Sequence, residues 1–390
     1  MPTSLKPGFI ALHGNRSEDL AQAVIAWLGQ NPLAPLEQEV VLVQSNGIAE
    51  WFKMELARQL GVCGSTRVEL PGRFLWRTYR ELLGPRAVPR DSPLDKLPMT
   101  WRLMQVLPGL LETRNFEPVR RYLAQDDPRR QLQLAQQLAD LFDQYQNYRS
   151  DWLEDWAGGR DLLLQAQGKQ IAVPPDQAWQ PELWRAVLGT LSESQRATIR
   201  PRLHRQAIQR LQGEDELGTR LARRVVVFGM SHMPASTLEA LAALSRHCQV
   251  LLAIPNPCRY YWGDIIEGRE LLRAERRRHA LREGRELSTV ALEDMHQHAH
   301  PLLAAWGRQS RDFIRQLDAF DDADETRQRF PQARIDLFDE SSDQDGTPLL
   351  GRVQNRIRDL EPLQPLSADA APEPLPAADR SIVFHIGHSR

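Results

Sequence analysis

The segment Val40–Phe52, VVLVQSNGIAEWF, decides the fold of this chain. Its β-branched run ends at Gln44, and the polar turn Gln44-Ser45-Asn46-Gly47 leads directly into an apolar helical spacing. This order predicts a strand, a turn and a helix, and ligands of open α/β sheets bind at the strand ends beside such turns. The turn supplies amides and hydroxyls where a phosphate loop would supply glycines, so it favours base edges or polar ligands over a triphosphate.

A second strand and helix precede this segment. Residues 9–12 are predicted to form a strand, and the apolar spacing of residues 17–28 predicts a helix that ends before Asn31-Pro32. Because a helix that joins two strands returns the chain in the same direction, this β-α-β unit predicts a parallel sheet. Residues 225–229 and 250–254 are predicted to add two further buried strands.

Helical periodicity dominates the region between Phe74 and about Leu211. We therefore expect an α/β core domain that is interrupted by an inserted all-helical domain. The predicted helices span residues 101–111, 129–149, 181–191 and 204–211. The predicted domains are residues 1–80 and 216–362 for the two parts of the core, with a surface loop at 320–345, residues 81–215 for the insertion, 363–380 for a linker and 381–390 for the start of a following domain. Residues 381–387 look like the first strand of that domain, so we expect a fragment of a longer protein.

Composition limits the classes of function. The 390 residues are 42% hydrophobic and 26% charged, and the net charge is −2, so any nucleic-acid surface must be a local patch. The three cysteines have no paired spacing, which argues against a zinc site or a disulfide framework and favours a reducing compartment. Neither a signal peptide nor an apolar run of membrane-spanning length is found in the sequence, so a cytoplasmic location without membrane contact is expected.

The predicted helix at residues 129–149 has two distinct faces. At about 100° per residue, apolar side chains gather on one side and polar side chains on the other. The polar side could be an ordinary solvated face. It could equally be a recognition surface, because carboxylates accept hydrogen bonds from cytosine amino groups and amides can read adenine. The apolar residues are Leu134, Leu138, Phe142 and Tyr145, and the polar residues are Asp140, Asp143, Gln144 and Asn147.

Aromatic and basic segments offer two further candidate contacts with nucleic acid. Trp76 and the cluster Tyr260-Tyr261-Trp262 could stack on bases, although aromatic residues at element ends are more often part of the core. Six arginines between Arg269 and Arg285 could neutralise phosphates or form a surface that contacts another subunit.

Several catalytic motifs are missing from the sequence. The phosphate-loop motif G-x-x-x-x-G-K-[ST] is not found, and Gly168-Lys169-Gln170 lacks both a preceding strand and the Ser or Thr that would hold magnesium. No HExxH motif and no Ser-His-Asp arrangement is found either. We therefore expect no catalytic residue, no metal site and no cofactor in this chain itself.

Four stretches carry a resemblance to a known family. VLVQSNGIAEW, ADLFDQYQNYR followed by DWL, NPCRYYWGDI and PLLAAWGRQSRD resemble, in the same order, the RecC (gamma) subunit family of bacterial exodeoxyribonuclease V, the RecBCD helicase–nuclease. The similarity runs from about Phe9 to the end of the chain. The family's subunits are much longer.

The resemblance implies a superfamily-1-helicase-like core that has lost its ATP motifs and carries a helical insertion. It implies a subunit without its own catalysis, in a heterotrimer with RecB-like and RecD-like partners that use ATP and Mg²⁺. Such a subunit helps to split the duplex end, passes the 3′-ended single strand through a tunnel and recognises the Chi sequence during DNA repair by recombination.

The resemblance also implies DNA-reading positions. Gln44 matches the family, whereas Asn46 and Glu50 stand where the family has Thr and Gln, which puts the details of base specificity in doubt because a carboxylate only accepts hydrogen bonds. Gln144 joins the set as part of the polar helix face. The remaining matching positions are Leu70, Trp76, Asp140, Leu141, Asp143, Arg149 and Arg205.

Three hypotheses follow from the sequence. In the first, the chain is a non-catalytic DNA-binding subunit domain that channels and reads a single strand. In the second, it is a scaffold that mainly docks the RecB-like and RecD-like subunits through the Arg269–Arg285 segment and the aromatic cluster. In the third, it is an active helicase or nuclease, which the missing phosphate loop disfavours.

Overall fold

The computed structural model describes residues 5–123, 127–165, 169–213, 217, 221–263, 300–322, 333–338, 347–361, 376 and 378–387. The chain divides into two compact units. The first, which we call the sheet unit, comprises Met1–Pro71, Ala222–Met233 and Ser245–Arg390. The second, the helical unit, comprises Gly72–Leu221 and Pro234–Leu244. The first boundary follows Pro71, whereas the sequence placed it after residue 80; the functional domain boundaries stay a prediction.

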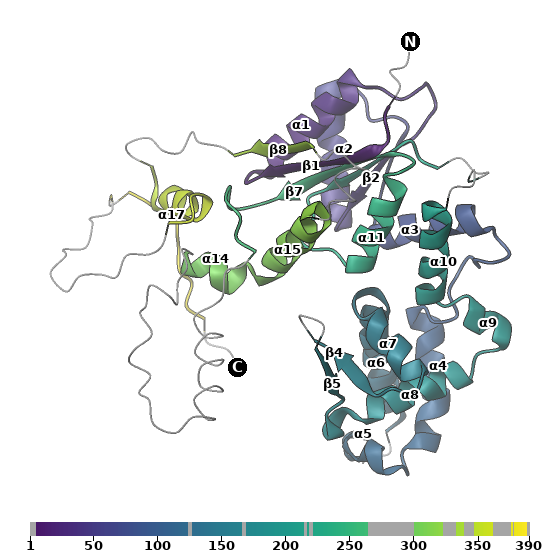
Figure 1. Cartoon of the computed structure of the whole chain (residues 1–390). Coiled ribbons are helices and arrows are strands. Elements are labelled where there is room, and N and C mark those ends of the chain that lie inside the picture. Colours follow the sequence, from purple (N-terminus) through teal and green to yellow (C-terminus); the bar gives the residue numbers. More distant parts are fainter. Residues whose placement is uncertain are drawn as a thin grey trace. The chain divides into compact units, whose positions relative to one another are not determined.

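A six-stranded sheet forms the centre of the sheet unit (Figure 1). The strand order is β3-β2-β6-β7-β1-β8, and every neighbouring pair is parallel. The α/β class with a parallel sheet, predicted from the sequence, is therefore confirmed. The strands are β1 (Gly8–Gly14), β2 (Glu39–Val43), β3 (Thr66–Glu69), β6 (Arg224–Phe228), β7 (Gln249–Pro255) and β8 (Ala333–Leu337).

Helices α1 (Ser17–Gln30) and α2 (Asn46–Leu60) pack against one face of this sheet (Figure 1). Their buried side chains, such as Val24 and Phe52, form one core with alternate residues of the strands, such as Val41 and Phe228. The intervening residues of β2, β6 and β7 are buried as well. Burial on both faces explains why these strands have continuous apolar runs in place of an alternating pattern.

One ion pair is buried at the start of β2 and β6. The guanidinium of Arg224 is fully buried and donates to both carboxylate oxygens of Glu39, at 3.1 and 2.5 Å. It also donates to the backbone oxygen of Asn31 at 2.8 Å, beyond the end of α1. This geometry ties β6, β2 and the loop after α1 together with charge-assisted hydrogen bonds.

A glycine allows β8 to lie against β1. Gly14 is opposite Leu337 in the parallel register. A methyl carbon at position 14 would lie 2.7 Å from the backbone oxygen of Leu337, which is closer than two such atoms can approach. The absence of a side chain at Gly14 therefore allows β8, the sixth strand, to pair with β1.

The segment after β7 forms a packed turn. Asn256 is buried, and its side-chain oxygen accepts hydrogen bonds from the backbone of Cys258 at 3.2 Å and from the indole of Trp262 at 2.9 Å. Trp262 is fully buried and so belongs to the core, whereas Tyr260 and Tyr261 are exposed. The segment Arg269–Arg285 lies outside the described residues. Helices α14 (Pro301–Trp306), α15 (Arg308–Asp322) and α17 (Leu349–Arg358) complete the sheet unit.

Two predictions near the end of the chain were wrong. Residues 320–345 were expected to form a surface loop, but α15 extends to Asp322 and residues 333–337 form β8. Residues 381–387 were expected to form a strand, but they have no regular secondary structure. An apolar β-branched run predicts a strand only where a neighbouring strand can pair with it. Most of the predicted linker, at 363–375 and 377, lies outside the described residues.

The helical unit has a core of its own. Phe142 of α6 stacks on Trp184 of α8, with ring centroids 5.4 Å apart, and both side chains are buried. The unit is not all-helical as predicted, because β4 (Leu162–Leu164) and β5 (Gln170–Ala172) form a small antiparallel sheet. Its helices are α3 (Pro71–Leu83), α4 (Lys96–Leu110), α5 (Glu117–Tyr122), α6 (Pro128–Tyr148), α7 (Ser150–Ala157), α8 (Trp179–Gly189), α9 (Glu193–Ala197), α10 (Arg200–Gln212) and α11 (Ala235–Leu244), with 3₁₀ turns at Arg114–Phe116 and Pro175–Gln177.

Candidate nucleic-acid interface

The strand order places a candidate binding crevice at the ends of β2 and β6. From β2 the chain continues to β3 on one side, and from β6 it continues to β7 on the other side. The direction of the connections therefore reverses between β2 and β6, which are neighbours. At such a reversal, ligands of open α/β sheets bind outside the carboxyl ends of the strands. The turn that begins at Gln44 lies at this position.

Side chains of the two turns meet at this crevice. The side-chain nitrogen of Gln44 lies 3.3 Å from Nδ1 of His232, which follows β6. Ser45 caps α2, because its hydroxyl oxygen accepts a hydrogen bond from the backbone of Ile48 at 3.3 Å. Asn46 begins α2 and is exposed. The side-chain oxygen of Gln44 and the amide of Asn46 are therefore offered to a ligand.

Two further predicted residues lie on the sheet unit. Glu50 is exposed on α2, and its carboxylate pairs with Lys53 at 2.9 Å. Leu70 follows β3 and is 39% exposed, so its apolar side chain is accessible to a ligand. Gln44, Asn46 and Glu50 share the start of one helix, whereas Leu70 follows the neighbouring strand.

The polar face of α6 is paired with cations from other elements of the helical unit. The carboxylate of Asp140 lies 2.8 Å from Nζ of Lys96 at the start of α4. The carboxylate of Asp143 lies 3.4 Å from the guanidinium of Arg200 at the start of α10. Gln144 is exposed, while Leu141 is partly buried against the core. The structure thus brings Asp140, Asp143 and Gln144 to one face but places Leu141 at its inner border.

Trp76 lines a cavity of about 480 Å³ in the helical unit. Its indole nitrogen donates to the backbone oxygens of Pro89 and Arg90, at 3.0 and 3.1 Å, so the ring orientation is fixed. Arg200 lines the same cavity and also pairs with Asp95 at 2.8 Å. Arg200 therefore connects the Trp76 cavity with Asp143 on the polar face of α6.

Arg149 lies at the end of α6 and has internal partners. Its guanidinium pairs with Asp151 at 2.8 Å and lies over the ring of Trp152, 3.8 Å from the centroid. It also donates to the backbone oxygen of Leu164 in β4. Arg149, named above as a DNA-reading position, therefore has the carboxylate of Asp151 as its ionic partner in the structure.

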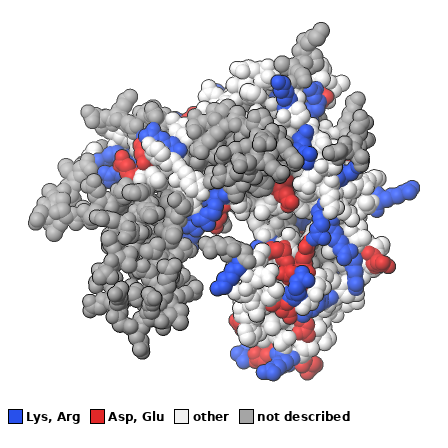
Figure 2. Space-filling view, viewed as in Figure 1, with Lys and Arg blue, Asp and Glu red and all other residues white. Residues whose placement is uncertain are grey.

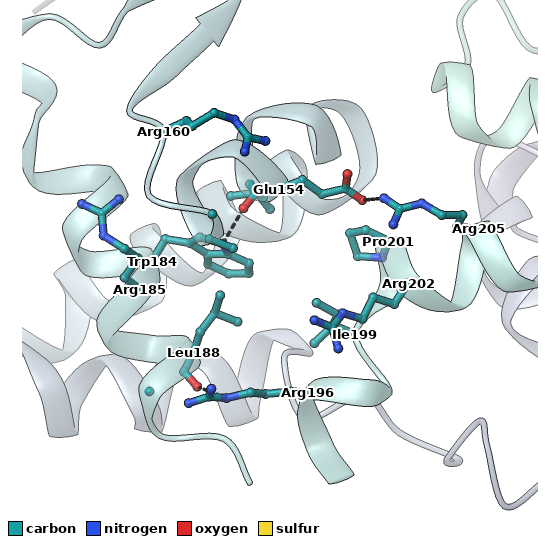
Figure 3. Close-up of a pocket in the computed structure, with 14 residues that line it drawn as sticks. Glu154, Arg160, Trp184, Arg185, Leu188, Arg196, Ile199, Pro201, Arg202 and Arg205 are labelled. Atoms are coloured by element: carbon teal, nitrogen blue, oxygen red, sulfur yellow. Dashed lines mark hydrogen bonds and ion pairs between the residues drawn. The ribbon is translucent and has the colours of Figure 1, made fainter. Parts of the chain in front are cut away.

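Arg205 lies apart from the polar face of α6, beside a cavity of about 600 Å³ between α7, α8, α9 and α10 (Figure 3). Its guanidinium forms an ion pair with Glu154 of α7. We call this cavity the arginine pocket, because Arg160, Arg185, Arg196, Arg202 and Arg205 line it. On the face shown in Figure 2, both acidic and basic side chains occur over the helical unit.

Sequence reasoning missed several members of these sites. His232 follows a buried strand at a distance of 188 positions from Gln44, and no local pattern links the two residues. Lys96 and Arg200 lie on α4 and α10, and they meet α6 only in the folded structure, so no local sequence pattern reveals them. Only the excess of arginine in the composition could have pointed to the arginine pocket. Among the described residues, no group of three or more metal-binding side chains is found and no helix is long and apolar enough to cross a membrane.

Comparison with known proteins identifies the family. The family model described as RecC, N-terminal domain, matches residues 9–360. The RecBCD enzyme subunit RecC of Escherichia coli K12 is 35% identical over an alignment of 402 positions, which covers 97% of this chain and 34% of that protein. The subunit of the same name from Haemophilus influenzae is 31% identical, and the alignment covers 98% of this chain and 35% of that protein. The subunit from Mycolicibacterium smegmatis is 29% identical, and the alignment covers 82% of this chain and 26% of that protein.

The chain spans about a third of the length of these relatives. The family model covers well over half of the chain, and the similarity to two relatives extends over nearly all of it. The chain therefore belongs to the RecC family and corresponds to its N-terminal domain.

Proposed function

We propose that this chain is the DNA-reading part of a non-catalytic subunit in a RecBCD-type exodeoxyribonuclease V. It channels the 3′-ended single strand and recognises Chi, with RecB-like and RecD-like subunits as its partners. ATP and Mg²⁺ are used by those partners. In this proposal the sheet unit is a superfamily-1-helicase-like core that no longer binds a nucleotide, and the helical unit is its insertion.

One observation supports this function above the others. The crevice at the ends of β2 and β6, where a nucleotide-binding sheet would hold phosphates, carries Gln44, Asn46 and His232. Side-chain amides and an imidazole offer both donors and acceptors at short range, which is what base edges require. They supply no ring of backbone amides and no lysine for a triphosphate.

The polar face of α6 would provide a second set of reading contacts on the helical unit. Asp140 and Asp143 can accept hydrogen bonds from the amino groups of cytosine or adenine once Lys96 and Arg200 turn to the DNA backbone. Trp76 would stack on a base at an orientation already fixed by its hydrogen bonds to the Pro89 and Arg90 backbone. Leu70 would add an apolar contact.

The test uses the intact three-subunit complex on duplex DNA with and without Chi. Gln44→Ala or Asp140→Ala should abolish the change of nuclease activity at Chi, while unwinding continues at its usual rate. Gln30→Ala and Asp176→Ala remove the same groups from exposed positions elsewhere and should leave the Chi response intact. A normal Chi response in both Gln44→Ala and Asp140→Ala would exclude the proposed reading surface.

A further inference from the structure

The arginine pocket has more positive charge than its own carboxylates neutralise. Arg160 pairs with Asp155 at 2.6 Å, Arg185 with Asp161 at 2.6 Å, and Arg205 with Glu154. Two of its guanidinium groups, Arg196 and Arg202, have no carboxylate partner among the described residues.

The two remaining arginines differ in how they are held. Arg196 of α9 donates its Nε hydrogen to the backbone oxygen of Leu188 at 3.1 Å, which fixes the side chain and leaves its two terminal nitrogens available (Figure 3). Arg202 is exposed in the first turn of α10, and its side chain makes no hydrogen bond or ion pair with another described residue. Helix α10 has 13 residues, and its positive end adds to the field in this pocket.

Apolar side chains form the rest of the wall. Trp184 is buried, and its indole nitrogen donates to the backbone oxygen of Leu153 at 3.0 Å, so its ring has one fixed orientation. Ile199 and Pro201 lie opposite, between Trp184 and α10 (Figure 3). A volume of about 600 Å³ is within the range of pockets that take a small organic group.

We propose that the arginine pocket binds one nucleotide of a DNA single strand, with the phosphate held by Arg196 and Arg202 and the nucleoside against the apolar wall. The planar guanidinium group matches phosphate oxygens in a bidentate geometry, which favours phosphate over a single carboxylate. This inference rests on the proposed function, and it extends the strand's contacts to residues outside the set implied by the family resemblance.

Glu154 has a defined part in this proposal. Its carboxylate forms an ion pair with the guanidinium of Arg205, and Glu154 is the one acidic residue among those that line the pocket. It therefore competes with an incoming phosphate for the guanidinium of Arg205. Removing the charge of Glu154 should strengthen anion binding, which a purely structural role of the ion pair would not predict.

The experiment measures binding of fluorescent oligothymidylate to the full chain at several salt concentrations. Arg202→Gln should weaken binding roughly tenfold, in line with the loss of one charge-assisted hydrogen bond. It should also reduce the slope of log K against log salt by about 0.7, the contribution of one phosphate on a single strand. Glu154→Gln should tighten binding. Arg86→Gln, which removes an exposed arginine that lines neither cavity, is the matched control.

Competitors distinguish the sources of the anion. Unlabelled oligothymidylate should displace the probe more effectively than thymidine monophosphate or inorganic phosphate, and polyglutamate should displace it poorly. Equal displacement by polyglutamate would overturn the proposal in favour of an acidic partner protein. Equal effects of Arg202→Gln and Arg86→Gln would also overturn it. The proposed function is judged separately, by the Chi response of Gln44→Ala, so a failure of the arginine pocket can be told apart from a failure of the proposed function.

Discussion

The side-chain nitrogen of Gln44 lies 3.3 Å from Nδ1 of His232, and this contact joins the turns that follow two neighbouring strands. The same nitrogen lies 3.4 Å from Nε2 of His232, so the imidazole ring restricts the amide of Gln44 before any ligand arrives. Preorganisation of this kind lowers the entropic cost of binding, because the side chain is already ordered in the free protein.

We expect His232→Ala to weaken the response of the three-subunit complex to Chi without affecting unwinding. The amide of Gln44 would be free to rotate, and the loss should be smaller than for Gln44→Ala, which removes the proposed base contact; such a contact is worth about 1–3 kcal/mol of discrimination. The measurement is the fraction of DNA molecules that are processed differently after Chi. A larger loss for His232→Ala than for Gln44→Ala would mean that His232 itself contacts the DNA.

Glu39→Ala should strongly destabilise the sheet unit. Arg224 is fully buried, so its guanidinium would keep the cost of desolvation and lose its carboxylate partner. Breaking a buried pair in this way typically costs about 3–5 kcal/mol. Urea unfolding followed by circular dichroism measures the change. Glu117→Ala breaks an exposed pair with Arg121 and should cost less than about 1 kcal/mol. Similar costs for the two variants would contradict this account.

The three thiols should react at very different rates. Burial raises the pKa of Cys248 to about 12, and burial is also the main reason that the pKa of Cys258 rises to about 11. The thiolate is the reactive form, so both residues should resist alkylation at neutral pH until the protein unfolds. Cys63 is partly exposed and should react first. Mass spectrometry after brief iodoacetamide treatment tests the order, and early labelling of Cys248 would disprove it.

Glu239 should make stability depend on pH in the acid range. Its carboxylate lies 3.0 Å from Nε2 of His204, whose Nδ1 lies 2.7 Å from the hydroxyl of Tyr79. The hydrogen bond with His204 is the main reason that the pKa of Glu239 lies below its usual 4.5. Its contribution is therefore present above about pH 4.5 and is lost as the pH falls through the lower folded pKa. The unfolding midpoint of Glu239→Gln, measured at a series of acid pH values, should fall less steeply with falling pH than the midpoint of the unaltered protein. An unchanged acid profile would exclude it.

The strands that a sequence reveals are those buried on both faces. Residues 40–43, 225–228 and 250–254 are short, continuous apolar runs, which are typical of strands buried on both faces, so the parallel sheet could be predicted. Strand β8, ARIDL, is short and half polar, and it became a strand because the edge of β1 was open to it. No property of the segment alone encodes that pairing.

The candidate site was predictable only where one helix or one turn carries several members. The polar face of α6 follows from helical periodicity, because Asp140, Asp143 and Gln144 recur at the spacing of one turn. Their partners Lys96 and Arg200 come from distant segments, so their contribution depends on how helices pack. The arginine pocket depends on the meeting of four helices, and no single stretch of sequence contains it.

Gly14 has a consequence for how the sheet can grow. Because the backbone oxygen of Leu337 occupies the place where a methyl carbon would stand, even alanine at position 14 would act as a wedge at this border. The methyl group would push β8 away and would also press on the side chain of Leu20 in α1, 3.2 Å from the same position, while β7 pairs with the opposite edge of β1. Because a hydrogen atom stands in place of a side chain at position 14, the sheet can accept β8 as its sixth strand.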